Sequence, residues 1–241
     1  MDLTPSVFKL THYQSTSERQ TAMALQRPKF LYFDLGNVLL NFDHHLACRQ
    51  MGAVAGVPAE RVWEFVFAGD LELRYEAGQL DDDEFFELFC RHTLKRPNRP
   101  ALLQAASEIF ELNVSIVPLV AALSAAGNRM GVLSNICGPH WSYCTAINQA
   151  VGQYGVPRYG ILAHSFEVFA LSYQIGACKP DPAIYAAAAK LAGCAAGEIF
   201  FVDDIAAHAT GARAAGFDAV QYTTTAALAA DLRARGLRFN Y

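Results

Sequence analysis

The amino-acid sequence predicts an α/β fold, with a parallel sheet that carries helices on both faces and an all-helical domain inserted after the first strand. Short apolar runs alternate with helix-like segments, which is the pattern of a parallel sheet joined by right-handed crossovers. Three of these runs lead directly into polar residues: Phe30–Phe33, Met130–Leu133 and Ile199–Val202. Ligands of open α/β sheets bind at the carboxyl ends of the strands, so these polar residues are expected to meet in one crevice.

The first apolar run, Phe30–Phe33, carries the carboxylate of Asp34 into a turn. The run has the length and composition of a buried strand. Gly36 and Asn37 follow, and both residue types tolerate the positive φ angles of a tight reversal. Residues 38–40 are again apolar and return the chain to the interior. On this stretch alone, an acid that only hydrogen-bonds the next turn and an acid held at the sheet edge for chemistry are equally good interpretations.

Polar residues of several kinds follow the other apolar runs. Ser134 and Asn135 follow the second run, Asp203 and Asp204 follow the third, and Lys179 lies in a Lys-Pro-Asp-Pro segment. Carboxylates, a hydroxyl, an amide and an ammonium group at one sheet edge are the inventory of an active site. The sequence therefore favours a chemical role for this edge.

Residues 45–114, between the first two strands, have apolar side chains at helical spacing and are expected to be helical throughout. Pro58 marks one helix start. The four consecutive acids at 81–84 mark another, because acidic side chains stabilise the positive end of a helix dipole. The remaining α/β core then comprises 29–44 and 115–241, whereas residues 1–28 lack periodicity and are expected to be an extension outside the fold.

The second half of the chain continues the alternation of helix and strand. Residues 172–181 are expected to loop and bring the lysine into position, and Gly138-Pro139 is expected to break the chain before a helix compatible with 141–150. The other expected elements are helices at 118–126, 183–192, 206–215 and 225–235, strands at 166–171 and 219–222, and a loop at 153–160.

Composition excludes several classes of protein. With 241 residues, 53% of them hydrophobic, the chain can form a substantial core, with or without a smaller domain. A net charge of −4 offers no basic field for nucleic acid, and no apolar run reaches the ~20 residues of a membrane span. Six scattered cysteines without a Cys-x-x-Cys pair, and no visible signal peptide, are typical of reduced thiols in a cytoplasmic protein.

In order and spacing, these motifs resemble those of the haloacid dehalogenase (HAD) superfamily, whose members mostly hydrolyse phosphate esters through an aspartyl intermediate. The similarity extends from about residue 29 to the C-terminus. The DLGNVL form of the first motif is most similar to the branch of sugar-phosphate phosphatases and the N-terminal domain of soluble epoxide hydrolases. The resemblance implies a Rossmann-like core, a C1-type helical cap at 45–114 and a small phosphorylated substrate.

The resemblance also implies a magnesium site. Asp34 corresponds to the nucleophile of the family, and Mg²⁺ is expected to be held by its carboxylate, by the backbone carbonyl of Gly36 and by Asp204. Asp203 is expected to lie behind these ligands or to be a further ligand. A small number of oxygen ligands suits Mg²⁺, which retains several waters.

Phosphate binding is assigned by the same resemblance. Lys179 corresponds to the lysine that restrains the nucleophile and offsets its charge. Ser134 corresponds to the phosphate-binding hydroxyl, and the backbone amides that follow it, beginning at Asn135, complete the cradle for the phosphoryl oxygens.

The sequence departs from the family pattern at the position two residues after the nucleophile. Most phosphatases of the family have a second aspartate there, which protonates the leaving group, and this chain has Gly36. Proton transfer of this kind is commonly worth ~10²–10⁴ in rate. The nearest titratable candidates to replace it are Asp43, His44 and His45. His208, where many relatives carry asparagine, is a second departure, with no role assigned.

Residues that select the substrate are expected in the cap, according to the resemblance. The candidates are His44, His45, Trp63, Arg74 and Tyr75. Aromatic residues at helical spacing more often belong to a core than to a binding surface, so a purely structural role is the alternative for each of them.

Three functions are compatible with these observations. A Mg²⁺-dependent phosphatase of a small phosphate monoester, such as a sugar phosphate, ranks first, because the Asp203-Asp204 pair indicates a cation. A metal-independent 2-haloacid dehalogenase ranks second, since dehalogenases of the family also lack the second acid. A catalytically weak ligand-binding or interaction protein ranks third.

Overall fold

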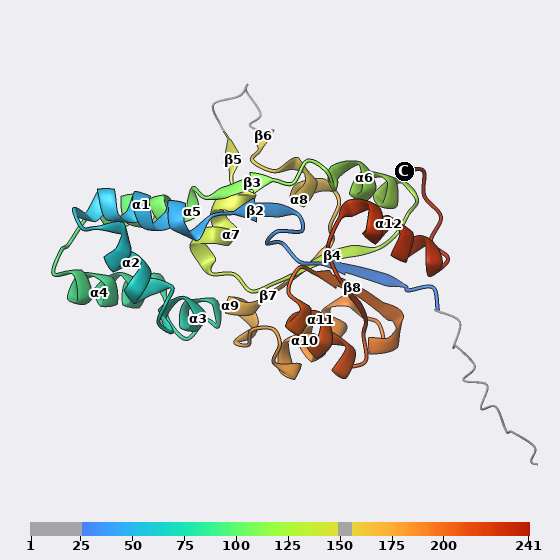
Figure 1. The fold of residues 1–241 in the computed structure, drawn as a ribbon. Coiled ribbons are helices and arrows are strands. Elements are labelled where there is room, and N and C mark those ends of the chain that lie inside the picture. The colour runs from blue at the N-terminus through green and yellow to red at the C-terminus, as the bar shows by residue number, and fades with distance from the viewer. Residues whose placement is uncertain (1–25, 149–155) are drawn as a thin grey trace, which may run out of the picture.

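The fold is known from a computed structural model of the chain, which describes residues 26–148 and 156–241 (Figure 1). Its centre is a five-stranded sheet in the order β7-β4-β1-β8-β9, in which every neighbouring pair is parallel. The predicted Rossmann-like α/β fold is confirmed. Most of the predicted extension at 1–28 lies outside the described residues. The strands are β1 (Phe30–Phe33), β4 (Met130–Ser134), β7 (Val168–Leu171), β8 (Ile199–Asp203) and β9 (Asp218–Gln221).

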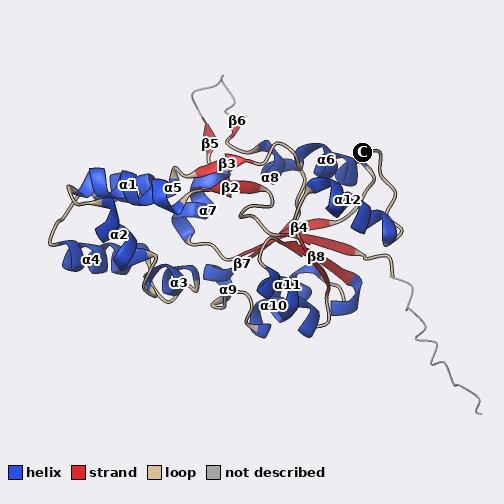
Figure 2. Ribbon diagram, viewed as in Figure 1, coloured by secondary structure: helices blue, strands red, loops and turns tan. Residues whose placement is uncertain are grey.

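Helices cover both faces of this sheet, as Figure 2 shows. In β1 the side chains of Phe30 and Tyr32 pack with α10 and α11, whereas Leu31 and Phe33 pack with α6 and α12. Because successive side chains of a strand point to opposite faces, a run that is apolar at every position identifies a strand buried on both sides. The covering helices are α6 (Val117–Ala125), α10 (Pro182–Ala192), α11 (Ala206–Ala214) and α12 (Thr225–Ala234).

A set of helices between β1 and β4, here called the helical insert, has an apolar core of its own. Pro58 precedes α2, and Asp81 begins α4 with a capping box, in which its side chain accepts from the Glu84 backbone amide while the Glu84 carboxylate accepts from the Asp81 amide. Both predicted helix starts are confirmed. The helices of the insert are α1 (His44–Ala55), α2 (Ala59–Val66), α3 (Leu71–Glu76), α4 (Asp82–Thr93) and α5 (Arg99–Ser107).

The sequence predicts that residues 45–114 are helical throughout, and this prediction is wrong at their C-terminal end. Residues Phe110–Leu112 form the strand β3, which pairs antiparallel with β2 at Leu40–Phe42. The apolar pattern of α5 runs on into Phe110 and so imitates a longer helix, while the partner strand lies some 70 residues away in the sequence. The resulting two-stranded ribbon contains both connections between the insert and the core.

Local structure also differs from expectation between β4 and α10. Gly138 and Pro139 begin a helix instead of breaking the chain, because a proline in the first turn loses no hydrogen bond. The helix ends at Thr145, so the predicted helix at 141–150 is too long: residues 146–148 are not helical. Residues 149–150 lie outside the described residues. The additional elements are α7 (Gly138–Thr145), β5 (Ile147–Asn148), β6 (Val156–Pro157), α8 (Gly160–His164), α9 (Ser172–Ile175) and a 3₁₀ turn at Ala196–Glu198.

Two further expectations concern membrane-spanning segments and the state of the cysteines. Within residues 26–148 and 156–241, no helix combines the length and the apolar character needed to cross a bilayer. All six cysteines lie in these ranges as free thiols.

Gly131 of β4 provides a test of the packing at the centre of the sheet. A Cβ at this position would lie 2.7 Å from Tyr32 Cε1 and 2.7 Å from the Val168 carbonyl oxygen. We expect Gly131→Ala to lower the free energy of unfolding by about 1–3 kcal/mol, because the sheet must shift to admit one methyl group. Urea unfolding measures this change.

The control for this test is Gly197→Ala. A Cβ at Gly197 would meet no atom within 4 Å, so this variant should unfold within about 0.5 kcal/mol of wild type. Equal midpoints for the two variants would contradict the tight packing around Gly131.

Candidate active site

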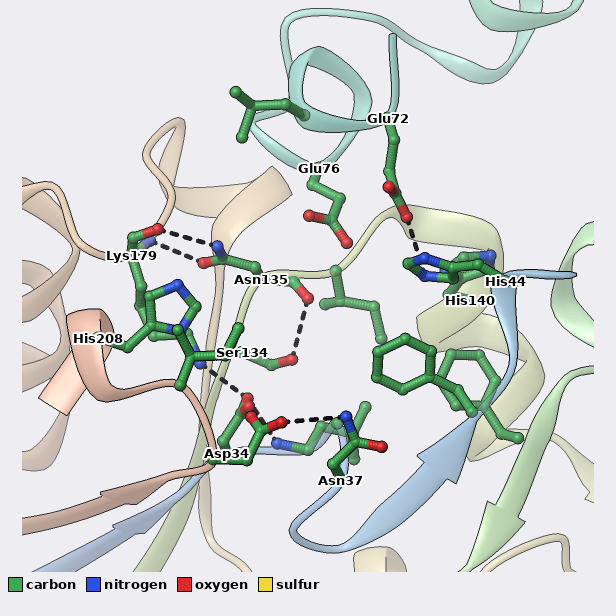
Figure 3. Close-up of a pocket in the computed structure, with 18 residues that line it drawn as sticks. Asp34, Asn37, His44, Glu72, Glu76, Ser134, Asn135, His140, Lys179 and His208 are labelled. Atoms are coloured by element: carbon green, nitrogen blue, oxygen red, sulfur yellow. Dashed lines mark hydrogen bonds and ion pairs between the residues drawn. The ribbon is translucent and has the colours of Figure 1, made fainter. Parts of the chain in front are cut away.

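The carboxyl ends of β1, β4 and β8 meet at a cavity of about 310 Å³ between the sheet and the helical insert (Figure 3). The loop that precedes α10 reaches the same place. The structure thus brings together the polar residues that the sequence placed at one sheet edge. The residues that line the cavity from the core side include Asp34, Gly36, Asn37, Ser134, Asn135, Lys179, Asp204 and His208.

The ammonium group of Lys179 lies at the centre of these side chains. Its Nζ donates to Asp34 Oδ1 at 2.8 Å, to Asp203 Oδ2 at 2.6 Å and to the Leu133 carbonyl oxygen at 3.1 Å. The lysine side chain is only 1% exposed. All three donors are satisfied by the ends of three adjacent strands, so this one group fixes two carboxylates relative to each other.

The burial of these groups shifts their protonation. Burial raises the pKa of Asp34 above its usual value, and the neighbouring Lys179 ammonium limits the rise. Burial acts in the same direction on Asp203, but Lys179 and the imidazole of His208 outweigh it and hold its pKa below the usual value. Burial disfavours the charged lysine, yet the two carboxylates raise its pKa overall. The lysine therefore stays charged although its side chain is buried.

Asn135 holds the lysine in place through its backbone. Its Nδ2 donates to the Lys179 carbonyl oxygen at 3.1 Å, and its Oδ1 accepts from the Lys179 amide at 2.7 Å. Both polar atoms of the amide are thus engaged by the loop that carries the lysine. Ser134, buried at the end of β4, is the neighbouring hydroxyl and donates to the Asn135 carbonyl oxygen at 3.2 Å.

Asp203 is held from several sides. Its Oδ1 accepts from the Ile205 amide at 2.8 Å and lies 3.1 Å from His208 Nδ1, while its Oδ2 is occupied by Lys179. The position of His208, to which the sequence assigned no role, is explained by this contact. Asp204 is more open, and its Oδ2 accepts from Asn37 Nδ2 at 3.0 Å.

The carboxylates fit a hard divalent cation. One oxygen from each of Asp34, Asp203 and Asp204 lies within 4.8 Å of the others, and no other group of three His, Cys, Asp or Glu side chains converges in this way within the described ranges. Because both oxygens of Asp203 already have donors, Asp34 and Asp204 are the better ligands. Gly36, whose carbonyl is the third expected ligand, lines the same cavity. Oxygen ligands of this kind suit Mg²⁺.

Of the three acid candidates near the nucleophile, only His44 lines the cavity. Asp43 instead caps α1, accepting from the His45 amide at 2.8 Å. The His45 ring stacks on Trp63 with centroids 4.4 Å apart, and both rings line a separate hollow on the insert. Consecutive residues at a helix start point in different directions, so at most one of them faces the cavity.

The other expected specificity residues also lie away from it. Tyr75 is 7% exposed, and its hydroxyl donates to Asp82 Oδ1 at 2.6 Å within the insert. Arg74 and Trp63 do not line the cavity either. None of these three side chains therefore lines the cavity in which they were expected.

Sequence reasoning missed several lining residues of the insert and its surroundings. Glu72 and Glu76 lie four residues apart on α3 and face the cavity together, and His140 of α7 lies beside His44 (Figure 3). Spacing of four places two side chains on the same face of a helix, which is the signal that could have identified the two glutamates. Phe42 and Phe110 of the ribbon complete this wall.

His44 Nε2 lies 3.1 Å from Glu72 Oε1. Burial raises the pKa of Glu72 to about 9 and lowers that of His44 to about 4. Both groups are therefore favoured in their neutral forms. Burial likewise lowers the pKa of His140 to about 4.

Comparison with known proteins gives matches over most of the chain. A family model described as haloacid dehalogenase-like hydrolase matches residues 28–216. The structure is similar to a HAD family enzyme of Bacteroides thetaiotaomicron in complex with magnesium and inorganic phosphate, with 22% identity, a TM-score of 0.68, and 82% of this chain and 95% of that chain covered.

Two further solved structures are similar. One is described as a predicted HAD-like family hydrolase of Porphyromonas gingivalis, with 21% identity, a TM-score of 0.70, and 86% of this chain and 98% of that chain covered. The other is the L-2-haloacid dehalogenase of Xanthobacter autotrophicus with chloropropionic acid covalently bound, with 20% identity, a TM-score of 0.57, and coverages of 86% and 82%. At these identities the likeness establishes the fold alone.

The buried lysine gives a prediction about stability. In Lys179→Met, Asp34 and Asp203 lose their cation, so the pKa of Asp34, already raised by burial, should rise further, and that of Asp203 should rise above the unfolded value of ~3.9. The folded variant then binds more protons than the unfolded chain, and its stability should fall as pH rises. We expect a loss of about 3–5 kcal/mol near neutral pH and a smaller loss at about pH 5.5.

Urea unfolding in EDTA at the two pH values measures this effect. Lys190→Met, at an exposed lysine of α10, is the control and should change stability little at either pH. A loss in Lys179→Met that is the same at both pH values would show that the two carboxylates do not depend on the lysine.

Proposed function

Because the chain belongs to the haloacid dehalogenase-like hydrolases, we propose that it hydrolyses a small phosphate monoester, such as a sugar phosphate, with Mg²⁺ and through an aspartyl-phosphate intermediate. The observation that carries this proposal is the buried contact of Lys179 with Asp34 and Asp203, next to the open carboxylate of Asp204. It combines a restrained nucleophile with a set of cation ligands at the bottom of a substrate-sized cavity.

Asp34 is the proposed nucleophile. Its Oδ1 accepts from the Leu35 amide at 2.7 Å and from Lys179, and no described residue donates to its Oδ2. These two donors fix the orientation of the carboxylate, and Oδ2 is the oxygen that attacks phosphorus. Holding the nucleophile at the correct angle removes much of the entropic part of the barrier.

Groups on the core side of the cavity would offset the negative charge of the phosphate ester. Asp34, Asp204 and the carbonyl of Gly36 would hold the cation, which would offset the negative charge of the phosphoryl oxygens. The Ser134 hydroxyl and the Asn135 backbone amide bind the same oxygens, whereas the Ile136 amide already donates to Ser172 Oγ at 2.9 Å. Asp203 keeps Lys179 and His208 in position. The helical insert is the proposed cap, because its α3 helix lines the cavity opposite the nucleophile.

A 2-haloacid dehalogenase is the second candidate, and the glycine at position 36 is the observation that favours it. The wall of the cavity argues against it. That wall carries Glu72 and Glu76, and among the described lining residues Lys179 is the only lysine or arginine. Its ammonium is fully engaged, so the carboxylate of a 2-haloacid would find no free lysine or arginine among these residues.

The first test of the proposal is Asp34→Asn. This variant should fold normally and lose p-nitrophenyl phosphate hydrolysis by roughly 10³-fold or more, because an amide cannot attack phosphorus. Asp43→Asn is the matched control, since asparagine caps a helix as well as aspartate does and Asp43 lies off the cavity. Full activity in Asp34→Asn would contradict the assignment of Asp34 as the nucleophile. Chloride release from 2-chloropropionate, without phosphatase activity, would establish the dehalogenase instead.

The second test concerns the metal. Asp204→Ala should abolish Mg²⁺ binding and activation more completely than Asp203→Ala, because the oxygens of Asp203 already accept from protein donors. Isothermal titration calorimetry with MgCl₂ and the Mg²⁺ dependence of p-nitrophenyl phosphate hydrolysis measure the two effects. The reverse order of the variants would indicate that Asp203 is the main ligand.

A further inference from the structure

The space beside Gly36 is closed. A Cβ on this glycine would lie 2.7 Å from Cε1 of Phe42, whose ring comes from β2. A side chain at position 36 would meet the ring of Phe42, so Gly36→Asp would have to displace this ring. The proton for an alkoxide leaving group must therefore come from another side of the cavity.

The titratable side chains that line the cavity outside the proposed nucleophile, lysine and metal site can be sorted by their partners. His44 and Glu72 are engaged with each other, and His140 Nε2 lies 3.2 Å from the Ala106 carbonyl oxygen. His208 is bound to Asp203 below the cavity. Glu76 is different, because no hydrogen bond or ion pair to it occurs among the described residues. Figure 3 shows its carboxyl group pointing from α3 into the open space above Ser134 and Asp34.

We propose that Glu76 is the general acid and base of the reaction, supplied by the helical insert in place of the missing aspartate; this inference rests on the proposed phosphatase function. In the first step, Asp34 Oδ2 forms a bond to phosphorus while the bond from phosphorus to the leaving oxygen breaks. The leaving oxygen takes the proton of the Glu76 carboxyl group. An alcohol and the aspartyl phosphate result, and Glu76 is left as a carboxylate.

In the second step the same carboxylate acts as a base. A water molecule attacks phosphorus from the side that the alcohol has left, and Glu76 takes its proton. The bond between phosphorus and Asp34 breaks, which returns the carboxylate of Asp34 and releases inorganic phosphate. Glu76 then carries the proton needed for the next turnover, so protons balance over the cycle.

The surroundings of Glu76 suit this exchange. Burial raises its pKa to about 7, although the positive charge of Lys179 acts in the opposite direction. The other titratable groups around it are Glu72 on its own helix, His44 and His140 across the cavity, and the thiols of Cys137 and Cys178. A carboxyl group that titrates near neutral pH is populated both as an acid and as a base, unlike an exposed glutamate near ~4.3.

The test is Glu76→Gln, assayed on a series of substituted phenyl phosphates from p-nitrophenyl phosphate to unsubstituted phenyl phosphate, with glycerol 2-phosphate as an alkyl ester. In kcat/KM, which covers the steps up to departure of the leaving group, p-nitrophenyl phosphate should stay within about threefold of wild type because nitrophenolate leaves without a proton, while the alkyl ester should fall by ~10²–10⁴. The loss of the base in the second step should lower kcat for every ester. In wild type, the rate on phenyl phosphate should decrease as pH rises through about 7, because the acid loses its proton, and the variant should lack this decrease.

Two variants control the experiment. Glu72→Gln makes the same change one turn away on α3, and any loss that it causes should be equal across the series. His208→Gln tests the remaining imidazole near the nucleophile. Circular dichroism and urea unfolding establish that each variant is folded.

The outcomes are distinct. A loss of kcat/KM in Glu76→Gln that is equal for all leaving groups, no loss at all, or a leaving-group dependence of kcat/KM that appears in His208→Gln instead would overturn the role of Glu76 while leaving the phosphatase function intact. Wild-type protein that hydrolyses no member of the series with Mg²⁺ would overturn the proposed function itself, and the role of Glu76 with it.

Discussion

One buried ammonium group, that of Lys179, makes the arrangement of this site possible. Two carboxylates at the ends of adjacent strands repel each other when both are charged and removed from water, and burying them without a cation is costly. The lysine bonds to both and to the carbonyl oxygen at the end of a third strand. The amide of Asn135 then fixes the backbone of the lysine itself. The positions of Asp34 and Asp203 relative to each other thus depend on this contact.

The core half of the site was also the part that the sequence predicted. Asp34, Asn135 and Asp204 directly follow strands, and a run that is apolar at every position indicates such a strand. Parallel strands bring their carboxyl ends to the same edge, so proximity follows from topology alone. Asp34, Ser134 and Asp204 therefore meet as expected, although they lie up to 170 residues apart in the sequence.

The insert half of the site could not be predicted in the same way. Asp43 and His45 are near the nucleophile in the sequence, but the first caps α1 and the second stacks on Trp63, because adjacent residues of a helix diverge. Glu72 and Glu76 have no motif, and only the docking of α3 over the sheet edge turns them toward the cavity. Strand β3 was missed because its partner is distant, and pairing between distant segments leaves no periodic signal in either one.

The ribbon formed by β2 and β3 has a mechanical consequence. Both connections between the insert and the core run through it side by side, held in register by the pairing of Leu40 with Leu112 and of Phe42 with Phe110. Twisting the two strands relative to each other would break the hydrogen bonds between them, whereas bending both strands together would preserve these bonds. Bending of the ribbon would therefore move α3 toward the sheet edge or away from it without breaking the pairing of its strands. Because Phe42 and Phe110 also line the cavity, the same bend would alter its walls.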